Sequence, residues 1–252
     1  MPEFWTNRLR NRAGRDATRT ISPTSGLPFC QSAYIEINHA RMTHLASLNL
    51  PVEHKSVLDV GCGVGQLTQF FLDRECTVVC IDGRDSNVEA IRSLYPNVNA
   101  HVVNVDTDSL LKFGMFDVVF CYGLLYHLEN PIGALRNMAS VCRELLLLET
   151  VICDADLPVL RLEAERDDAD QAVSGLGSRP SPSFVAMAIK HSGFPFLYVP
   201  RVPPNHECFR FKRKNNFEST RKGYRLRSIF IASRNPIESA QLFSFDEQPT
   251  FE

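Results

Sequence analysis

The stretch SVLDVGCGVGQLT, residues 56–68, changes character near its middle. The first half is apolar and rich in valine, whereas the second half carries glycines at alternate positions: Gly61, Gly63 and Gly65. Apolar residues then return with helical spacing at Leu67, Phe70 and Phe71. A buried strand, a tight turn and a helix produce this pattern. Because glycine is needed where backbone approaches a ligand closely or adopts a positive φ, the turn is the first candidate binding element.

Length and composition bound the class of protein. The chain has 252 residues, 44% of them hydrophobic, which suits one α/β domain with additions. The net charge of -2 gives no general attraction to nucleic acid or to an anionic membrane. No apolar run approaches the roughly 20 residues of a membrane span. The eight cysteines form no C-x-x-C pair, so we expect buried free thiols, no metal site and a cytoplasmic location.

The remaining segments predict alternating strands and helices. Further strands are expected at Thr77–Asp82, Ala100–Val105, Phe116–Cys121, Arg143–Thr150, Phe196–Val199 and Arg225–Ser233. Helices are expected at Ser32–Leu48, Ser86–Leu94, Pro131 to about Val141, and Ser183–Ser192. The leucines of 143–150 also suit a helix, but their place after a helix favours a strand. The fold class predicted is α/β, a Rossmann-like, seven-stranded, mostly parallel sheet with helices on both faces and an antiparallel last strand.

The domain organisation follows from composition. Residues 1–50 form an arginine-rich arm and a helix, and the arm is either partly ordered or a lid anchored by Trp5 and Phe29. Residues 51–235 form the main domain. Residues 153–182 and 201–225 are expected to be substrate-side insertions, and 236–252 a tail.

Polar residues follow the predicted strands at the edge where ligands bind in open α/β sheets. Asp82 ends the second strand about 20 residues after Gly61, where a carboxylate can accept hydrogen bonds from ribose hydroxyls. The alternative is a helix-capping aspartate, a role that Asp85 or Ser86 fits better. After the third strand, Asn104 and Asp106 compete for the rim of an adenine pocket. The dinucleotide fingerprint requires a glycine or alanine where this chain has Gln66, which disfavours an NAD-dependent reductase.

The pieces VLDVGCGVG, VVCID, FDVVFCYGLLYHLENP and LLLLET together resemble the class I S-adenosylmethionine (SAM)-dependent methyltransferases, over roughly residues 50–235. The resemblance implies SAM as cofactor and S-adenosylhomocysteine (SAH) as product. It also implies that Asp59 and Gly61 hold the turn against the methionine part, and that Cys121 and Tyr122 lie near the sulfonium. The cofactor-binding residues expected on this basis are Asp59, Gly61, Cys62, Gly63, Asp82, Gly83, Asn104, Val105, Asp106, Cys121 and Tyr122.

The segments YGLLYHLENP, LETVI and PSPSF are similar to the tRNA uridine carboxymethyltransferases and to related small-molecule enzymes. The chain lacks the extended amino-terminal region of the tRNA enzymes, so we expect the cofactor chemistry to carry over and the tRNA substrate not to. No Asn/Asp-Pro-Pro-Tyr/Phe or Pro-Cys follows the fourth strand, which disfavours base exocyclic-amine and cysteine-adduct C5 methylation.

Three residues are candidates for the chemistry itself. Methyl transfer to an oxygen or nitrogen is helped by a general base, and histidine suits neutral pH. His127 is the first candidate, His206 the second, and Glu149 either orients a neighbour or acts on substrate. The expected partner is a small-molecule acceptor, with the oligomeric state left open. Two alternatives remain. One is a tRNA-modifying enzyme that uses the basic segment 201–227, although the simpler interpretation of that segment is a solvated loop. The other is a non-catalytic SAM-binding subunit.

Overall fold

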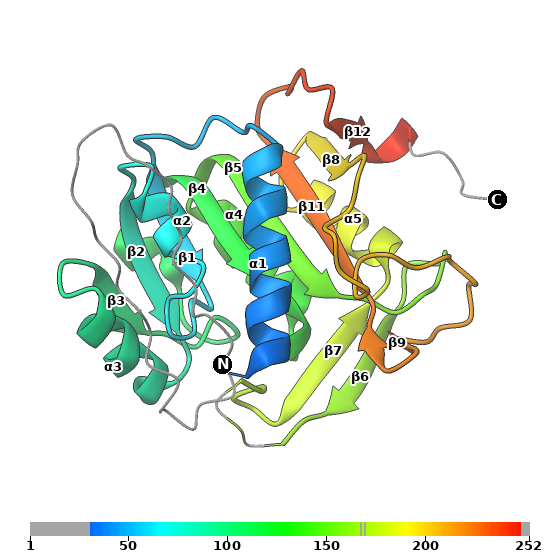
Figure 1. The fold of residues 1–252 in the computed structure, drawn as a ribbon, viewed down its shortest axis with the longest axis horizontal. Coiled ribbons are helices and arrows are strands. Elements are labelled where there is room, and N and C mark those ends of the chain that lie inside the picture. The colour runs from blue at the N-terminus through cyan, green and yellow to red at the C-terminus, as the bar shows by residue number, and fades with distance from the viewer. Residues whose placement is uncertain (1–30, 167, 169, 248–252) are drawn as a thin grey trace, which may run out of the picture.

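The computed structural model describes residues 31–166, 168 and 170–247. They form one large β-sheet with helices packed on both of its faces (Figure 1). The predicted lid with Trp5 and Phe29 lies outside the described residues. None of the described helices is long and apolar enough to cross a membrane. None of the seven cysteines in the described part forms a disulfide.

The sheet has eight strands in the order β12-β8-β11-β5-β4-β1-β2-β3. The strands β3, β2, β1, β4 and β5 are mutually parallel, whereas β11 runs antiparallel to both β5 and β8. The predicted Rossmann-like class is therefore confirmed, with one strand more than expected. The strands are β1 (Ser56–Val60), β2 (Thr77–Asp82), β3 (Asn99–Val102), β4 (Phe116–Tyr122), β5 (Cys142–Val151), β8 (Phe196–Pro200), β11 (Arg227–Ser233) and β12 (Leu242–Ser244).

Five α-helices and two hairpins complete the described chain. The helices are α1 (Ser32–Ser47), α2 (Gln69–Leu72), α3 (Asp85–Leu94), α4 (Pro131–Ser140) and α5 (Pro182–His191), with 3-10 turns η2 (Leu110–Phe113), η3 (Leu125–His127) and η4 (Phe245–Glu247). The hairpins are β6 (Leu160–Ala164) with β7 (Leu176–Pro180), and β9 (Thr220–Arg221) with β10 (Tyr224–Arg225).

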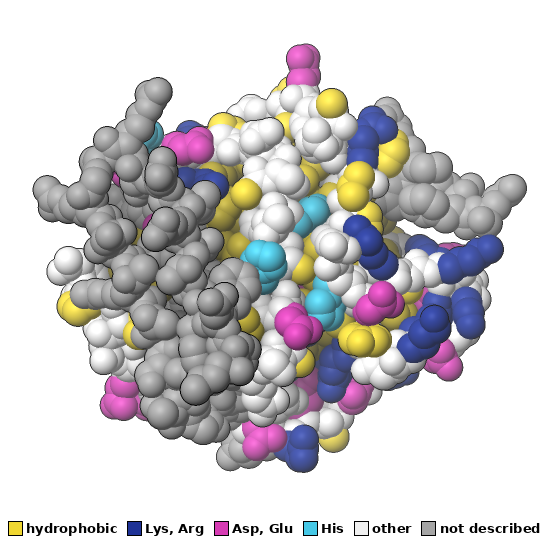
Figure 2. All heavy atoms as spheres, in the orientation of Figure 1, with side chains coloured by type: hydrophobic (Ala, Val, Ile, Leu, Met, Phe, Trp, Pro, Cys, Tyr) yellow, Lys and Arg dark blue, Asp and Glu magenta, His cyan; other side chains and the backbone are white. Residues whose placement is uncertain are grey.

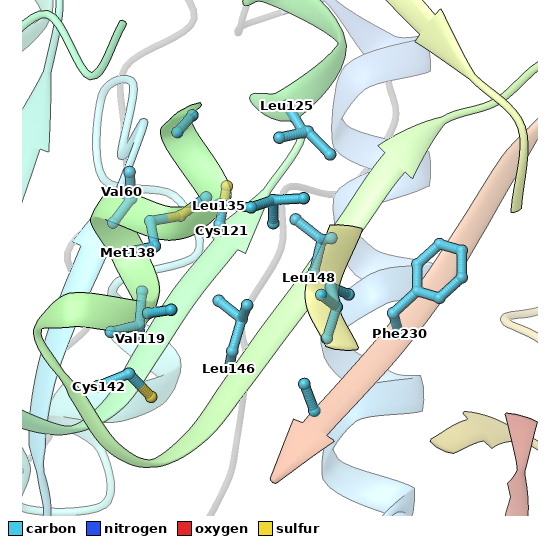
Figure 3. Packing of buried hydrophobic residues seen from close by; sticks show 14 of the residues in the cluster. Val60, Val119, Cys121, Leu125, Leu135, Met138, Cys142, Leu146, Leu148 and Phe230 are labelled. Carbon is cyan, nitrogen blue, oxygen red and sulfur yellow. The ribbon is translucent and has the colours of Figure 1, made fainter. Parts of the chain in front are cut away.

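Period-two alternation along the central strands builds a core on each face of the sheet. In β4, Val118 and Phe120 join the cluster that includes α1, α2 and α3. The alternate residues Val119 and Cys121 join the cluster that includes α4 and α5. Figure 3 shows the second cluster, with Met138 of α4 close to the strand residues. Burial on both faces explains why these strands are apolar throughout.

Three sequence predictions need correction. The third strand ends at Val102 rather than 105, because Asn104 starts a turn in which its carbonyl accepts from Thr107 and Asp108. The expected insertion 153–182, for which no strand was predicted, contains the β6–β7 hairpin. The predicted tail from 236 is wrong for Leu242–Ser244, which form β12 and pair with the edge strand β8.

Candidate functional site

The glycine turn follows β1 directly and is anchored to β2. The backbone amides of Gly61 and Cys62 both donate to the carbonyl of Ile81, at 2.8 and 3.1 Å. Gly61 has φ +73° and Gly65 has φ +81°, conformations that side-chain-bearing residues rarely adopt. A Cβ on Gly61 would lie 2.8 Å from the Cβ of Leu124. The turn therefore needs glycine for its backbone conformation and for close approach of the loop after β4.

Asp82 joins this turn to the start of α3. Its Oδ2 accepts from the amide of Gly63 at 2.9 Å, and its Oδ1 accepts from the amide of Arg84 and from Asn87 Nδ2, each at 3.0 Å. Burial raises the pKa of Asp82, although these hydrogen bonds oppose the effect. Asp82 is not the capping residue of α3, which is Arg84. Its carboxylate ties the glycine turn to the segment before α3 while the residue also lines the pocket described next.

One pocket collects most of the predicted cofactor residues at the carboxyl ends of the parallel strands. Those that line it are Gly61, Cys62, Gly63, Asp82, Gly83, Asn104, Val105, Asp106 and Tyr122. Asp106 also holds the loop before α4, because its carboxylate accepts from the amides of Glu129 and Asn130 at 3.2 and 3.1 Å. Burial raises its pKa, and those amides oppose the rise.

Two predicted cofactor residues lie behind the pocket wall. Asp59 is 2% exposed and accepts a 2.6 Å hydrogen bond from Thr68 Oγ1. This bond links the end of β1 to the segment after the glycine turn. Burial raises the pKa of Asp59 to about 7, partly offset by Thr68. Cys121 is fully buried, and burial raises the pKa of its thiol. Neither side chain lines the pocket.

Tyr122 lines the pocket with part of its surface, and its hydroxyl is buried. The residue lines the pocket and is 4% exposed, yet its hydroxyl has no hydrogen-bond partner among the described residues. Burial raises the pKa of the phenol, and the nearby Glu149 raises it further. A buried polar group without a partner is energetically costly.

Helix α1 supplies pocket residues beyond the predicted cofactor-binding set; of these, Tyr34 and Arg41 were expected from the sequence to be within reach of a cofactor, whereas Asn38 was not. Tyr34, Asn38 and Arg41 line the pocket. Arg41 Nη1 donates to Asn38 Oδ1 at 2.7 Å, and Asn38 Nδ2 donates to Gln66 Oε1 at 2.6 Å. Helical spacing places 34, 38 and 41 on one side of α1, and that polar stripe was the available signal. Gln171 and Val173 also line the pocket, from a segment predicted only as an insertion.

The environment of Glu149 differs from the one expected of a residue that acts on substrate. It is completely buried, its Oε2 accepts from Arg41 Nη2 at 2.6 Å, and its Oε1 accepts from Arg227 Nη1 at 2.9 Å. Burial alone raises the pKa of Glu149, but Arg227 and Arg41 outweigh it and lower that pKa. Arg227 also donates to the hydroxyl of Tyr126 at 3.0 Å. Glu149 is thus an ion-paired group behind the pocket and does not line it.

The structure separates the two candidate histidines. His127 ends η3 and lines the same pocket as the glycine turn and Asp82. Its Nδ1 lies 2.5 Å from Glu165 Oε2. Burial lowers the pKa of His127, although Glu165 opposes this. His206 lies outside the pocket, with Nδ1 accepting from the amide of Cys208 at 3.2 Å.

Known proteins resemble the chain over this same region. A family model described as a methyltransferase domain matches residues 58–144. The tRNA U34 carboxymethyltransferase of Actinobacillus succinogenes is 33% identical over 132 residues, which is 50% of this chain and 40% of that protein. The enzyme of the same name from Pseudoalteromonas translucida is 31% identical over 122 residues, 46% of this chain and 38% of its own. The chain thus spans about two fifths of the length of these relatives.

Solved structures share the fold over a larger part of the chain. The N-terminal domain of EvdMO1, crystallised in the presence of SAH and D-fucose, aligns with a TM-score of 0.59 at 19% identity, covering 78% of this chain and 81% of that one. A SAM-dependent methyltransferase from Mesorhizobium loti aligns with a TM-score of 0.54 at 14% identity, covering 77% and 98%. The strand order, the glycine turn and the matched family model agree with one another. Residues 58–144 therefore match a methyltransferase domain, and the chain resembles the class I SAM-dependent methyltransferases in sequence and in fold.

Proposed function

We propose that the chain binds SAM in the pocket at the glycine turn and transfers its methyl group to an oxygen or nitrogen of a small-molecule acceptor. His127 takes the acceptor proton in this proposal. When bound, SAM supplies an electrophilic methyl group and a neutral thioether leaving group, so the protein needs mainly to bind, align and deprotonate.

The pocket residues fit such a cofactor. Asp82 offers carboxylate oxygens at the place where ribose is bound in adenosine-containing cofactors, and the glycine turn lets backbone approach closely. Tyr122 lines the same pocket. We assign the adenosyl end to Asp82 and Asn104, and the reactive end to Tyr122 and the loop after it.

One observation carries the catalytic part of the proposal: His127 is the only histidine among the described residues that line this pocket. Burial lowers its pKa, so the imidazole is neutral near pH 7 and can accept a proton. In the reaction, the acceptor atom forms its bond to the methyl carbon as the carbon–sulfur bond breaks. The acceptor proton moves to His127, and the products are the methylated acceptor and SAH.

Two measurements test the proposal in order. A thermal-shift comparison of SAM, SAH and NAD is expected to show stabilisation by the first two only, and stabilisation by NAD alone would overturn the cofactor assignment. Methyl-labelled SAM is then incubated with a small-molecule extract and with total tRNA. Replacing His127 by Gln should reduce label transfer by about 10²–10⁴-fold while SAH affinity stays unchanged. Full transfer by that variant would remove His127 as the base, and binding without any transfer would favour a non-catalytic SAM-binding subunit.

A second candidate is methyl or carboxymethyl transfer to tRNA, favoured by the names of the relatives and by a basic surface. Lys and Arg side chains gather on the side of the molecule where Figure 1 places β9 (Figure 2). Arg210, Lys212, Lys214 and Lys222 are exposed there and form no ion pair with the described residues. Such a surface matches a phosphate backbone.

The tRNA alternative makes a separate prediction. Filter binding at about 50 and 200 mM salt should show strongly salt-dependent affinity, and alanine at Lys212, Lys214 and Lys222 should lower the slope of log affinity against log salt by about 3. Lys112→Ala, a change in the distant turn η2, is the matched control. Absence of tRNA binding at low salt would end this alternative.

A further inference from the structure

Glu165 lies where a hairpin outside the main sheet meets the loop that carries His127. It follows β6, and its amide donates to the carbonyl of Gly175 at 2.9 Å, which closes the end of the β6–β7 hairpin. Its side chain is 2% exposed. The carboxylate therefore points inward, and its partners come from both the hairpin and η3.

The carboxylate of Glu165 is held by three different groups. Oε2 lies 2.5 Å from His127 Nδ1 and also accepts from the amide of Ala172 at 2.8 Å, while Oε1 accepts from Arg179 Nη2 at 2.9 Å. Burial alone raises the pKa of Glu165, but His127, Ala172 and Arg179 reverse this and bring that pKa to about 2. Glu165 is therefore a carboxylate at neutral pH, and the contact with His127 requires a proton on Nδ1.

That requirement fixes the tautomer of the imidazole. A neutral histidine that donates from Nδ1 has an unprotonated Nε2, which can only accept. The neighbouring ring of Tyr126, with its centroid 4.0 Å from that of His127, limits how the imidazole can turn. His127 thus presents a proton acceptor, as the proposed reaction requires.

The surrounding residues leave Glu165 little freedom. Arg179 is fully buried and donates from Nη1 to the carbonyls of Tyr126 and Ser178 at 2.8 and 2.9 Å. A Cβ on Gly177 would lie 2.4 Å from Glu165 Oε1 and 2.7 Å from the carbonyl of Tyr126, so a glycine is needed there. Arg179 and its main-chain bonds already tie the hairpin to η3. The Glu165 carboxylate contacts both Arg179 and His127, so the hairpin also fixes the orientation of the imidazole.

We propose that Glu165 is a positioning residue for catalysis, which holds His127 in the Nδ1–H tautomer and stabilises the imidazolium formed when His127 takes the acceptor proton. This inference rests on the proposed function for its purpose, but the pairing itself can be tested without an acceptor. The charged groups that face His127 are Glu165, Arg179 of β7 and Arg227 of β11. The two guanidiniums disfavour the imidazolium, so Glu165 is the group that compensates them.

The experiment is an NMR titration of the full chain with ¹⁵N-labelled histidine, in which the His127 signal is assigned from its loss in H127Q. The wild type is expected to show the Nδ1–H tautomer. In E165Q the stabilising charge is gone, so the pKa of His127 should fall by about 1–3. E163Q is the matched control, because Glu163 lies on the same hairpin and contacts Arg179, 3.2 Å from its Nε, without contacting His127. It should leave the titration unchanged.

Several outcomes would overturn the inference. An Nε2–H tautomer in the wild type contradicts it, and so does an unchanged His127 titration in folded E165Q. If E165Q does not fold, E165D is measured in its place, because aspartate keeps the charge on a shorter side chain. The pKa of His127 should then fall by less than the fall of about 1–3 expected when the charge is lost. A fall as large as that in E165D contradicts the proposal. SAH binding, measured separately by calorimetry, reports on the proposed function. An intact pairing without SAH binding would therefore reject that function and not the pairing.

Discussion

Replacing Glu149 by Gln should cost more stability than any other conservative change in β5. The side chain of Glu149 is 0% exposed, and its two guanidinium partners, Arg41 and Arg227, are 3% and 10% exposed. Glutamine keeps the shape but removes the negative charge that contacts both cations. An uncompensated charge in a buried pair typically costs about 3–5 kcal/mol. For a chain of this size, that corresponds to a melting temperature lower by about 6–20 °C.

Urea unfolding of E149Q beside E144Q provides the measurement. Glu144 lies on the same strand and pairs with Lys55 at 2.8 Å, but their side chains are 37% and 30% exposed. Such a surface pair contributes only about 0–1 kcal/mol, so E144Q should resemble the wild type. If E149Q also stays within about 1 kcal/mol of the wild type, burial does not make this ion pair essential, and the reasoning is wrong.

The same ion pairs predict a dependence on pH. Burial acts to raise the pKa of Glu149, yet Arg227 and Arg41 outweigh it and hold that pKa below its ordinary value. A carboxylate whose pKa is lower in the folded state contributes stability above its unfolded pKa of about 4.3 and loses it as pH falls through the folded value. The stability difference between wild type and E149Q should therefore be constant near neutral pH and shrink in acid. A difference that grows below about pH 4 would contradict the assignment.

Three further predictions concern the turn, the pocket and the sheet edge. Asp82→Asn should weaken SAH binding by about 10–100-fold in calorimetry, whereas the exposed Asp85→Asn should not; equal effects would favour the helix-capping role for both. Gly61→Ala, at φ +73° and against Leu124, should cost about 1–3 kcal/mol in urea unfolding and remove the thermal shift caused by SAH; a wild-type thermal shift would count against the turn as the binding element. A chain ending at residue 241 loses β12, and its free energy of unfolding should be about 2–4 kcal/mol lower than that of a chain ending at 247, because Leu242 is 4% exposed. Equal free energies of unfolding would mean that residues 242–247 contribute no stability, as expected of a tail.

The sheet and the residues at the glycine turn that line the pocket were predictable because their signals are local. A buried strand followed by glycines at 61, 63 and 65 predicts a strand, a tight turn and a helix. The alternation of Val118 to Cys121 between the two cores follows from the period of a strand. The third strand was predicted too long because Val103 and Val105 are buried although the ladder has already ended. Apolar character reports burial, and only pairing decides where a strand stops.

The catalytic side could be predicted only in part, because its contacts join distant segments. His127 was identified from its place after the fourth strand, but Glu165 lies 38 residues later in the chain, within an acidic run typical of a solvated loop. Nothing local distinguishes Glu165 from Glu163, because both carboxylates contact Arg179. Only the fold brings Glu165 to His127 and buries it to 2% exposure, while Glu163 stays 34% exposed. Arg179 donates to the Glu165 carboxylate at 2.9 Å, and Gly177 leaves room for that carboxylate, because a Cβ there would lie 2.4 Å from Glu165 Oε1. These contacts indicate that substitutions at Gly177 and Arg179 should act on the Glu165–His127 pair, whereas the loop between β6 and β7 lines the proposed cofactor pocket through Gln171 and Val173.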